Sequence, residues 1–196
     1  MKRKTLDLLL TSGGAMLTIV LIAAGALLLW GYNFTNNEVH NQLARQEIFF
    51  PSAKTINTKH SENYISRSVQ LPYAGKQVLT GAEAKAYAYK VQMDVYPMPF
   101  HGVYAKISAY AMAHPKTAKM AALVTTSFRA VTLQGLLLQA YAFSVFGTLA
   151  LDGALAAFCA AFVLLVLTGL GLWHVRKVPV EEEFPHTGSV STAKAA

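Results

Sequence analysis

Three long apolar runs constrain the fold of this chain more than any other feature of its sequence. They cover residues 8–30, 130–151 and 154–173, and only the dipeptide Asp152-Gly153 separates the second run from the third. A helix rises about 1.5 Å per residue, so about 20 apolar residues cross a hydrocarbon core of about 30 Å. Because Asp-Gly is a favourable tight-turn pair, the runs predict three membrane crossings, the last two joined by a turn.

The expected fold is therefore an all-α membrane protein. It has three transmembrane helices and a small, mostly helical extracytoplasmic domain between the first and the second. A hydrophobic content of 54% with only 14% charged residues agrees with this class. The predicted segments are a basic cytoplasmic N-terminus (1–7), three transmembrane helices (8–30, 130–151 and 154–175), the extracytoplasmic domain (31–129) and a disordered tail (176–196).

Basic residues at the start of the chain bear on its orientation. Lys2, Arg3 and Lys4 precede the first run, an arrangement shared by cleaved signal peptides and retained signal anchors. The run is longer than the usual apolar core of a cleaved signal, about 7–15 residues, which favours a signal anchor with a cytoplasmic N-terminus. Three crossings then place the central domain and the C-terminal tail outside, although Arg176 and Lys177 oppose that placement of the tail.

The central domain is basic. Residues 31–129 hold eleven Lys/Arg and five Asp/Glu, which gives a net charge of +6. A basic surface close to a membrane attracts anionic lipid headgroups, whereas nucleic-acid binding requires a cytoplasmic domain with a recognisable binding motif. We therefore expect contact with anionic lipid or simple solvation, and no nucleic-acid partner.

Local signals place several helices in and around this domain. Residues 34–46 extend the first span as a helix, and Thr80-Gly81-Ala82-Glu83 is a capping box that predicts a helix over residues 81–95. Further helices are expected over residues 102–113 and 116–128, the latter running directly into the second span. Residues 52–80, rich in Ser, Thr, Asn and Lys, predict irregular chain with a short extended piece at 64–71.

No residue pattern predicts catalysis or a cofactor. His101, His114 and Asp94 are the nearest approach to a two-histidine, one-carboxylate metal site, but their spacing favours ordinary positions at helix ends. Cys159 is the sole cysteine and lies in an apolar run, so neither a disulfide nor a cysteine metal site is expected. No nucleophile elbow or phosphate-binding glycine loop is present.

Polar and small side chains within the apolar runs are candidates for contacts between helices. Uncharged polar groups form hydrogen bonds between membrane helices, and small residues at four-residue spacing permit close approach. A ligand pocket is the alternative use of the same residues. The helix-packing candidates are Gln134, Gln139, Ala140, Ser144, Thr148, Ala157, Ala161 and Thr168.

Three segments carry a resemblance to a known group of proteins. They are residues 46–51 (Gln-Glu-Ile-Phe-Phe-Pro), residues 75–88 with the Thr80-Gly81-Ala82-Glu83 helix start, and residues 135–143. On these segments the chain resembles a family of small actinobacterial integral membrane proteins of unknown function. The resemblance implies a multi-pass protein of the bacterial cytoplasmic membrane and implies no activity.

The sequence thus favours a non-enzymatic accessory, scaffold or partner-binding subunit of the cell envelope. Its expected partners are the lipid bilayer and either another membrane protein or further copies of itself. Two alternatives stay open, an extracytoplasmic sensor of a ligand or lipid and a membrane enzyme whose site has no recognised signature.

Overall fold

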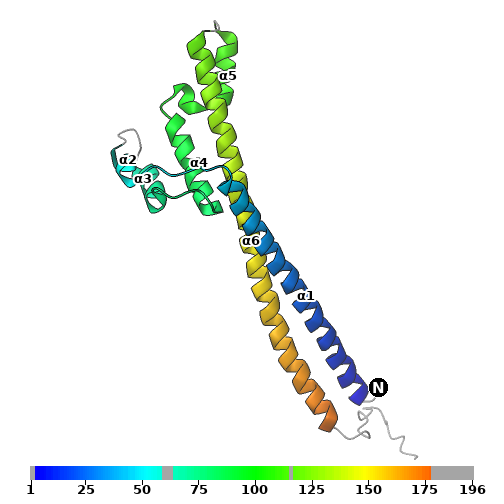
Figure 1. The fold of residues 1–196 in the computed structure, drawn as a ribbon. Coiled ribbons are helices and arrows are strands. Elements are labelled where there is room, and N and C mark those ends of the chain that lie inside the picture. The colour runs from blue at the N-terminus through cyan, green and yellow to red at the C-terminus, as the bar shows by residue number, and fades with distance from the viewer. Residues whose placement is uncertain (1–2, 59–63, 115–116, 178–196) are drawn as a thin grey trace, which may run out of the picture. The chain divides into compact units, whose positions relative to one another are not determined.

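The computed structural model describes residues 3–58, 64–114 and 117–177, and its regular elements there are all helices (Figure 1). In the described residues one isolated antiparallel bridge joins Phe49 to Gln77. Beside it, the Phe50 amide donates a hydrogen bond to the Lys76 carbonyl, and the Val78 amide donates one to the Ile48 carbonyl. The elements are α1 (Arg3–Ala44), α2 (Ala53–Thr58), α3 (Tyr64–Gln70), η1 (Leu71–Tyr73), α4 (Gly81–Val95), η2 (Pro99–Gly102), α5 (Tyr104–Ala113) and α6 (Ala118–Lys177).

The chain divides into two compact units, and the long helices α1 and α6 contribute to both. The first unit comprises residues 1–29 and 152–196, and the second comprises residues 30–151. Two helical segments, Leu8–Ala44 and Ala118–Lys177, are long and apolar enough to cross a membrane. Of the predicted disordered tail (176–196), Arg176 and Lys177 belong to helix α6, and residues 178–196 lie outside the described residues.

Helix α6 corrects the sequence-based count of spans. It continues without a break from Ala118 to Lys177, so the turn predicted at Asp152-Gly153 is wrong. The second and third predicted spans (130–151 and 154–175) are consecutive parts of one helix of 60 residues. The described chain therefore has two long apolar helices where three were expected.

The physical reason is that helix formers outweigh one glycine. Gly inside a helix costs only about 1 kcal/mol relative to Ala, and the residues flanking Asp152-Gly153 are mainly Leu and Ala. A turn would also leave backbone amides without partners, which is expensive in apolar surroundings. Gly153 further provides room for a neighbour, because a Cβ atom there would lie 3.2 Å from Leu28 Cδ1.

The first unit is an antiparallel helix pair. Gly153 of α6 lies against Leu28 near the end of the α1 portion, whereas Gly171 lies against Thr11 near its beginning. Residue numbers on α6 therefore fall as those on α1 rise. The end of α6 consequently lies beside the start of α1 within this unit.

The second unit confirms the local helix signals of the sequence. Helix α1 continues to Ala44, as predicted, and α4 spans Gly81–Val95. Both hydrogen bonds of the capping box are present, with Glu83 N donating to Thr80 Oγ1 at 3.3 Å and Thr80 N donating to Glu83 Oε2 at 2.9 Å. Helices α5 and α6 likewise begin close to the predicted positions.

The prediction of irregular chain for residues 52–80 is wrong in part, because α2 and α3 form there. Ile56, Ser66 and Gln70 are almost completely buried, so these short helices are held by packing against the domain. Helices of six or seven residues are unstable alone in water, and no local sequence signal predicts these two.

One hydrophobic core joins α1, α4 and α6 in the second unit. Stacked and edge-on contacts of the Phe50 ring with Tyr73 and Tyr87 extend this core to the loop that follows α1. Its buried members are Val39, Leu43, Phe50, Val78, Ala84, Ala86, Ala88, Val91 and Leu137.

Helix α4 packs closely on α6 at its first residue. A Cβ atom at Gly81 would lie 1.9 Å from Ser144 Oγ and 2.4 Å from Ser144 Cβ. Further along, Lys85 Nζ donates a hydrogen bond to Tyr141 Oη at 3.2 Å and lies 4.5 Å from the centre of that ring. Gln134 Nε2 donates to Gln92 Oε1 at 3.5 Å. Glycine at position 81 thus sets the distance at which the other contacts form.

We predict that Gly81→Ala lowers the free energy of unfolding by about 1–3 kcal/mol, because the added methyl group overlaps Ser144. Adding Ser144→Gly removes the overlapping atoms, so the two changes should couple favourably by about 1 kcal/mol or more. The measurement is denaturant unfolding of the full chain in detergent.

Gly31→Ala is the matched control, because a Cβ atom there meets nothing within 4 Å. This control should leave stability unchanged or slightly raised. Additive effects of Gly81→Ala and Ser144→Gly would contradict the close contact between α4 and α6.

Candidate functional site

Small residues allow the two helices of the first unit to approach closely. Cβ atoms at Gly14 and Gly171 would lie 2.8 Å from Thr168 Oγ1 and 3.0 Å from Thr11 Oγ1. At Gly25 the added atom would lie 2.9 Å from the Phe158 ring. These glycines act as the flat surfaces against which threonine and phenylalanine side chains of the other helix pack.

Buried positions in this pair recur at seven-residue spacing. On α1 they are Thr18 and Gly25, with half-buried Thr11 in the same register, and on α6 they are Ala154 and Ala161. A seven-residue repeat is the pattern of helices that pack along their length with a left-handed supercoil. Within the first unit, helix pairing therefore follows this repeat.

Four of the eight candidate residues are buried or lie against another helix or the core of their unit. Ala161 is buried, Thr168 faces Gly14, Ser144 faces Gly81, and Ala140 packs against the core of the second unit.

The other four candidates have different surroundings. Gln134 bonds to Gln92 of α4, Ala157 is half-buried, and Gln139 is exposed. Thr148 is also exposed and donates to the Ser144 carbonyl of its own helix. The four-residue stripe of small residues therefore does not continue through Thr148.

Sequence reasoning missed the partners on the opposite helices. Gly25 and Gly81 make close approaches in their units, and the sequence signal for Gly25 is its seven-residue spacing from Thr18 and Thr11. Gly14 and Gly25 are eleven residues apart, as three turns of a helix require for a common face.

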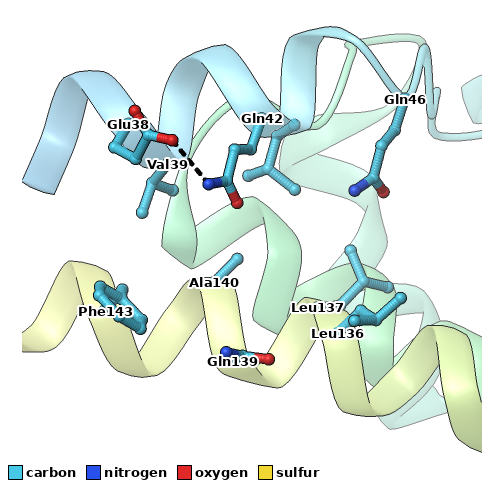
Figure 2. A pocket seen from close by; sticks show the side chains of 10 residues that line it. Glu38, Val39, Gln42, Gln46, Leu136, Leu137, Gln139, Ala140 and Phe143 are labelled. Atoms are coloured by element: carbon cyan, nitrogen blue, oxygen red, sulfur yellow. Dashed lines mark hydrogen bonds between the residues drawn. The ribbon is translucent and has the colours of Figure 1, made fainter.

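A groove of about 210 Å³ lies between α1 and α6 in the second unit (Figure 2). Figure 2 shows Glu38, Gln42 and Gln46 on the α1 side, and the Gln42 amide donates to Glu38 Oε1 at 2.7 Å. Opposite them, Gln139 and Phe143 project from α6. One carboxylate and three amides among apolar side chains can bind a small ligand that carries hydrogen-bond donors.

The histidines and Asp94 of the possible metal site are placed in separate contacts. Asp94 accepts a hydrogen bond from Lys90 at 2.5 Å, His101 stacks on Tyr96, and His114 stacks on Tyr110. In the described part of the chain, no three His, Cys, Asp or Glu side chains converge in a way that could hold a metal ion.

Comparison of the chain with protein-family models, curated proteins and solved structures finds no match. Function must therefore be inferred from geometry, and two features of the second unit bear on it. One is the groove, and the other is the exposed apolar side of α6.

We predict that Gly14→Leu destabilises the helix pair of the first unit, whereas Gly13→Leu does not. A side chain at position 14 collides with Thr168, but one at position 13 meets nothing within 4 Å. The expected loss for Gly14→Leu is about 1–3 kcal/mol. Thermal unfolding in detergent, followed by circular dichroism, measures it, and equal effects of the two neighbouring substitutions would contradict the assigned contact.

Proposed function

We propose that this chain is a membrane protein anchored by a two-helix hairpin, and that its basic helical domain acts on the outer side by binding protein partners. The paired apolar parts of α1 and α6 in the first unit form the membrane anchor. The antiparallel contacts Thr11–Gly171 and Leu28–Gly153 carry this proposal, because they make the two apolar segments a hairpin. The mode of action is contact, without a catalysed reaction.

The charge pattern supports a cytoplasmic position for both ends of the hairpin. Lys2, Arg3 and Lys4 precede α1, and α6 ends with Arg176 and Lys177. Lys177 Nζ lies 3.9 Å from the centre of the Trp173 ring, a combination typical of a membrane interface. Two crossings place all these basic residues on one side, so the conflict that arose with three crossings is removed.

Exposed apolar residues on α6 in the second unit support partner binding. Leu136, Phe143 and Phe146 are 53%, 52% and 67% exposed, although they belong to the unit that contains the folded domain. A helix that is apolar on nearly all sides is normally covered by protein or lipid. A contiguous exposed apolar surface on a folded domain marks an interaction site.

A second candidate function, the sensing of a small ligand, rests on the groove beside Glu38. Its amides and carboxylate face an apolar wall that includes Leu137 and Phe143. A ligand with an ammonium or hydroxyl group next to an apolar body fits this chemistry.

We predict that green fluorescent protein fused after Ala196 is fluorescent, because that end of the chain lies in the cytoplasm. Alkaline phosphatase at the same position should be inactive, whereas phosphatase inserted after Thr58, at the end of α2, should be active. Fluorescence and phosphatase activity in a bacterial host measure both positions.

Phosphatase activity at both positions would restore three crossings and contradict the hairpin. Activity only after Ala196 would reverse the orientation. Recovery of the untagged chain in the soluble fraction would overturn the membrane assignment itself.

A further inference from the structure

A polar pocket lies in the second unit where α1, the start of α4 and α6 meet. Its volume is about 200 Å³, and all of its lining residues fall within residues 30–151. This cavity, here called the α4 pocket, shares no lining residue with the groove beside Glu38. Its polar lining residues are Tyr32, Asn36, Thr80, Ser144 and Thr148, and the others are glycine and alanine.

The α4 pocket is uncharged. Among the described residues, no Asp, Glu, Lys, Arg or His side chain lines it, although residues 31–129 carry a net charge of +6. A charged ligand would enter this pocket without an opposite charge to pair with, at a cost in desolvation. The lining therefore selects a neutral ligand.

Three hydroxyl groups of the lining already use their protons within the chain. Ser144 Oγ donates to the Tyr141 carbonyl at 2.9 Å, and Thr148 Oγ1 donates to the Ser144 carbonyl at 3.0 Å. Thr80 Oγ1 donates to Glu83 Oε2 at 3.0 Å. A hydroxyl group has one proton and two lone pairs, so these oxygens can only accept further hydrogen bonds. A ligand on this side of the pocket must therefore donate.

The α1 side of the pocket offers both donors and acceptors. Within the described residues, neither Tyr32 nor Asn36 has a hydrogen-bond partner for its side chain. The Asn36 amide can donate and accept, and the Tyr32 hydroxyl group can do the same. A Cβ atom at Gly147 would lie 3.8 Å from Tyr32 Cδ2, so this ring lies close to α6. The ring adds an apolar surface next to the polar groups.

We infer that the α4 pocket binds a neutral sugar. Each sugar hydroxyl group donates one hydrogen bond and accepts others, which matches the hydroxyl oxygens of α6 and the amide of Asn36 together. The C–H groups of the sugar ring pack on the Tyr32 ring. An amine matches only the acceptors of the pocket, and a carboxylate is repelled by the lone pairs of Ser144 and Thr148.

Two sources can supply such a sugar, a free molecule or the headgroup of a glycolipid. Asn36 follows Trp30 by six residues, about 9 Å along the helix. Tryptophan at the end of an apolar run is typical of a membrane interface, so the pocket lies at the level of the outer headgroups. This placement rests on the proposed function, whereas the chemistry of the ligand does not.

Sugar binding by the full chain tests the inference. The chain is placed in phosphatidylcholine nanodiscs, and NMR titration measures the dissociation constants of glucose, galactose and mannose. At least one of these hexoses should bind in the millimolar range or more tightly. The uronate of that hexose, with a carboxylate in place of the CH₂OH group, should bind at least ten times more weakly. Binding of no hexose, or equally tight binding of the uronate, would overturn the inference.

Two conservative variants locate the site. Asn36→Leu removes the amide and Thr148→Val removes one hydroxyl oxygen, and both residues are exposed, so the fold should be retained. Each variant should raise the dissociation constant of the bound hexose about fivefold, the effect of one lost hydrogen bond. Asn37→Leu and Thr132→Val are matched controls on the same helices, exposed and outside the pocket, and should leave it unchanged. Equal effects of variant and control would contradict the assigned pocket.

A second set of nanodiscs separates the two sources of the sugar. A diacylglycerol that carries the same hexose is added to the bilayer. A headgroup site should then bind the free hexose more weakly because of competition, and a site for free sugar should bind it as before.

The outcomes also separate this inference from the proposed function. A chain that stays in the membrane, with both reporters as predicted, but binds no hexose would overturn the sugar site and leave the hairpin intact. Hexose binding by a chain recovered in the soluble fraction would overturn the hairpin and support the sugar site.

Discussion

The unbroken backbone of α6 is the constraint on which the rest of this structure depends. In apolar surroundings each amide needs a partner, and a helix supplies one within its own segment. Asp152-Gly153 therefore stays helical, at a cost of about 1 kcal/mol for the glycine. Because α6 does not reverse, its last apolar part can pair antiparallel with the start of α1, and its first part can serve as a wall of the domain core.

Local signals in the sequence predict the elements whose stability is local. The Thr80–Glu83 capping box fixes the start of α4, and the absence of Gly and Pro after Thr117 predicts that α6 runs into its apolar segment. Helices α2 and α3 could not be predicted in this way, because they depend on the burial of Ile56, Ser66 and Gln70. The Asp152-Gly153 dipeptide is typical of turns in water, but here its Leu and Ala neighbours favour a continuous helix.

The candidate packing residues show a similar division. Thr168 and Ser144 were predicted from their own helix, and each has a close contact in its unit. Gly81, which lies against Ser144, was not predicted, because glycine has no side chain by which a contact can be recognised in sequence. Thr148 was predicted from four-residue spacing but is exposed, because α6 buries Leu137 and Gly147 in the second unit, ten residues apart. Knowledge of which helix lies opposite is needed to choose between these periods.

Disulfide formation within the first unit tests the hairpin most directly. In a Cys159→Ala background, Thr11→Cys is combined either with Gly171→Cys or with Ala154→Cys, and the full chain is oxidised in membranes. The hairpin predicts an intramolecular disulfide for the first pair, because a Cβ atom at Gly171 lies 3.0 Å from Thr11 Oγ1, and none for the second. Three crossings would place Ala154 level with Thr11, so a disulfide in the second pair and none in the first would contradict this account.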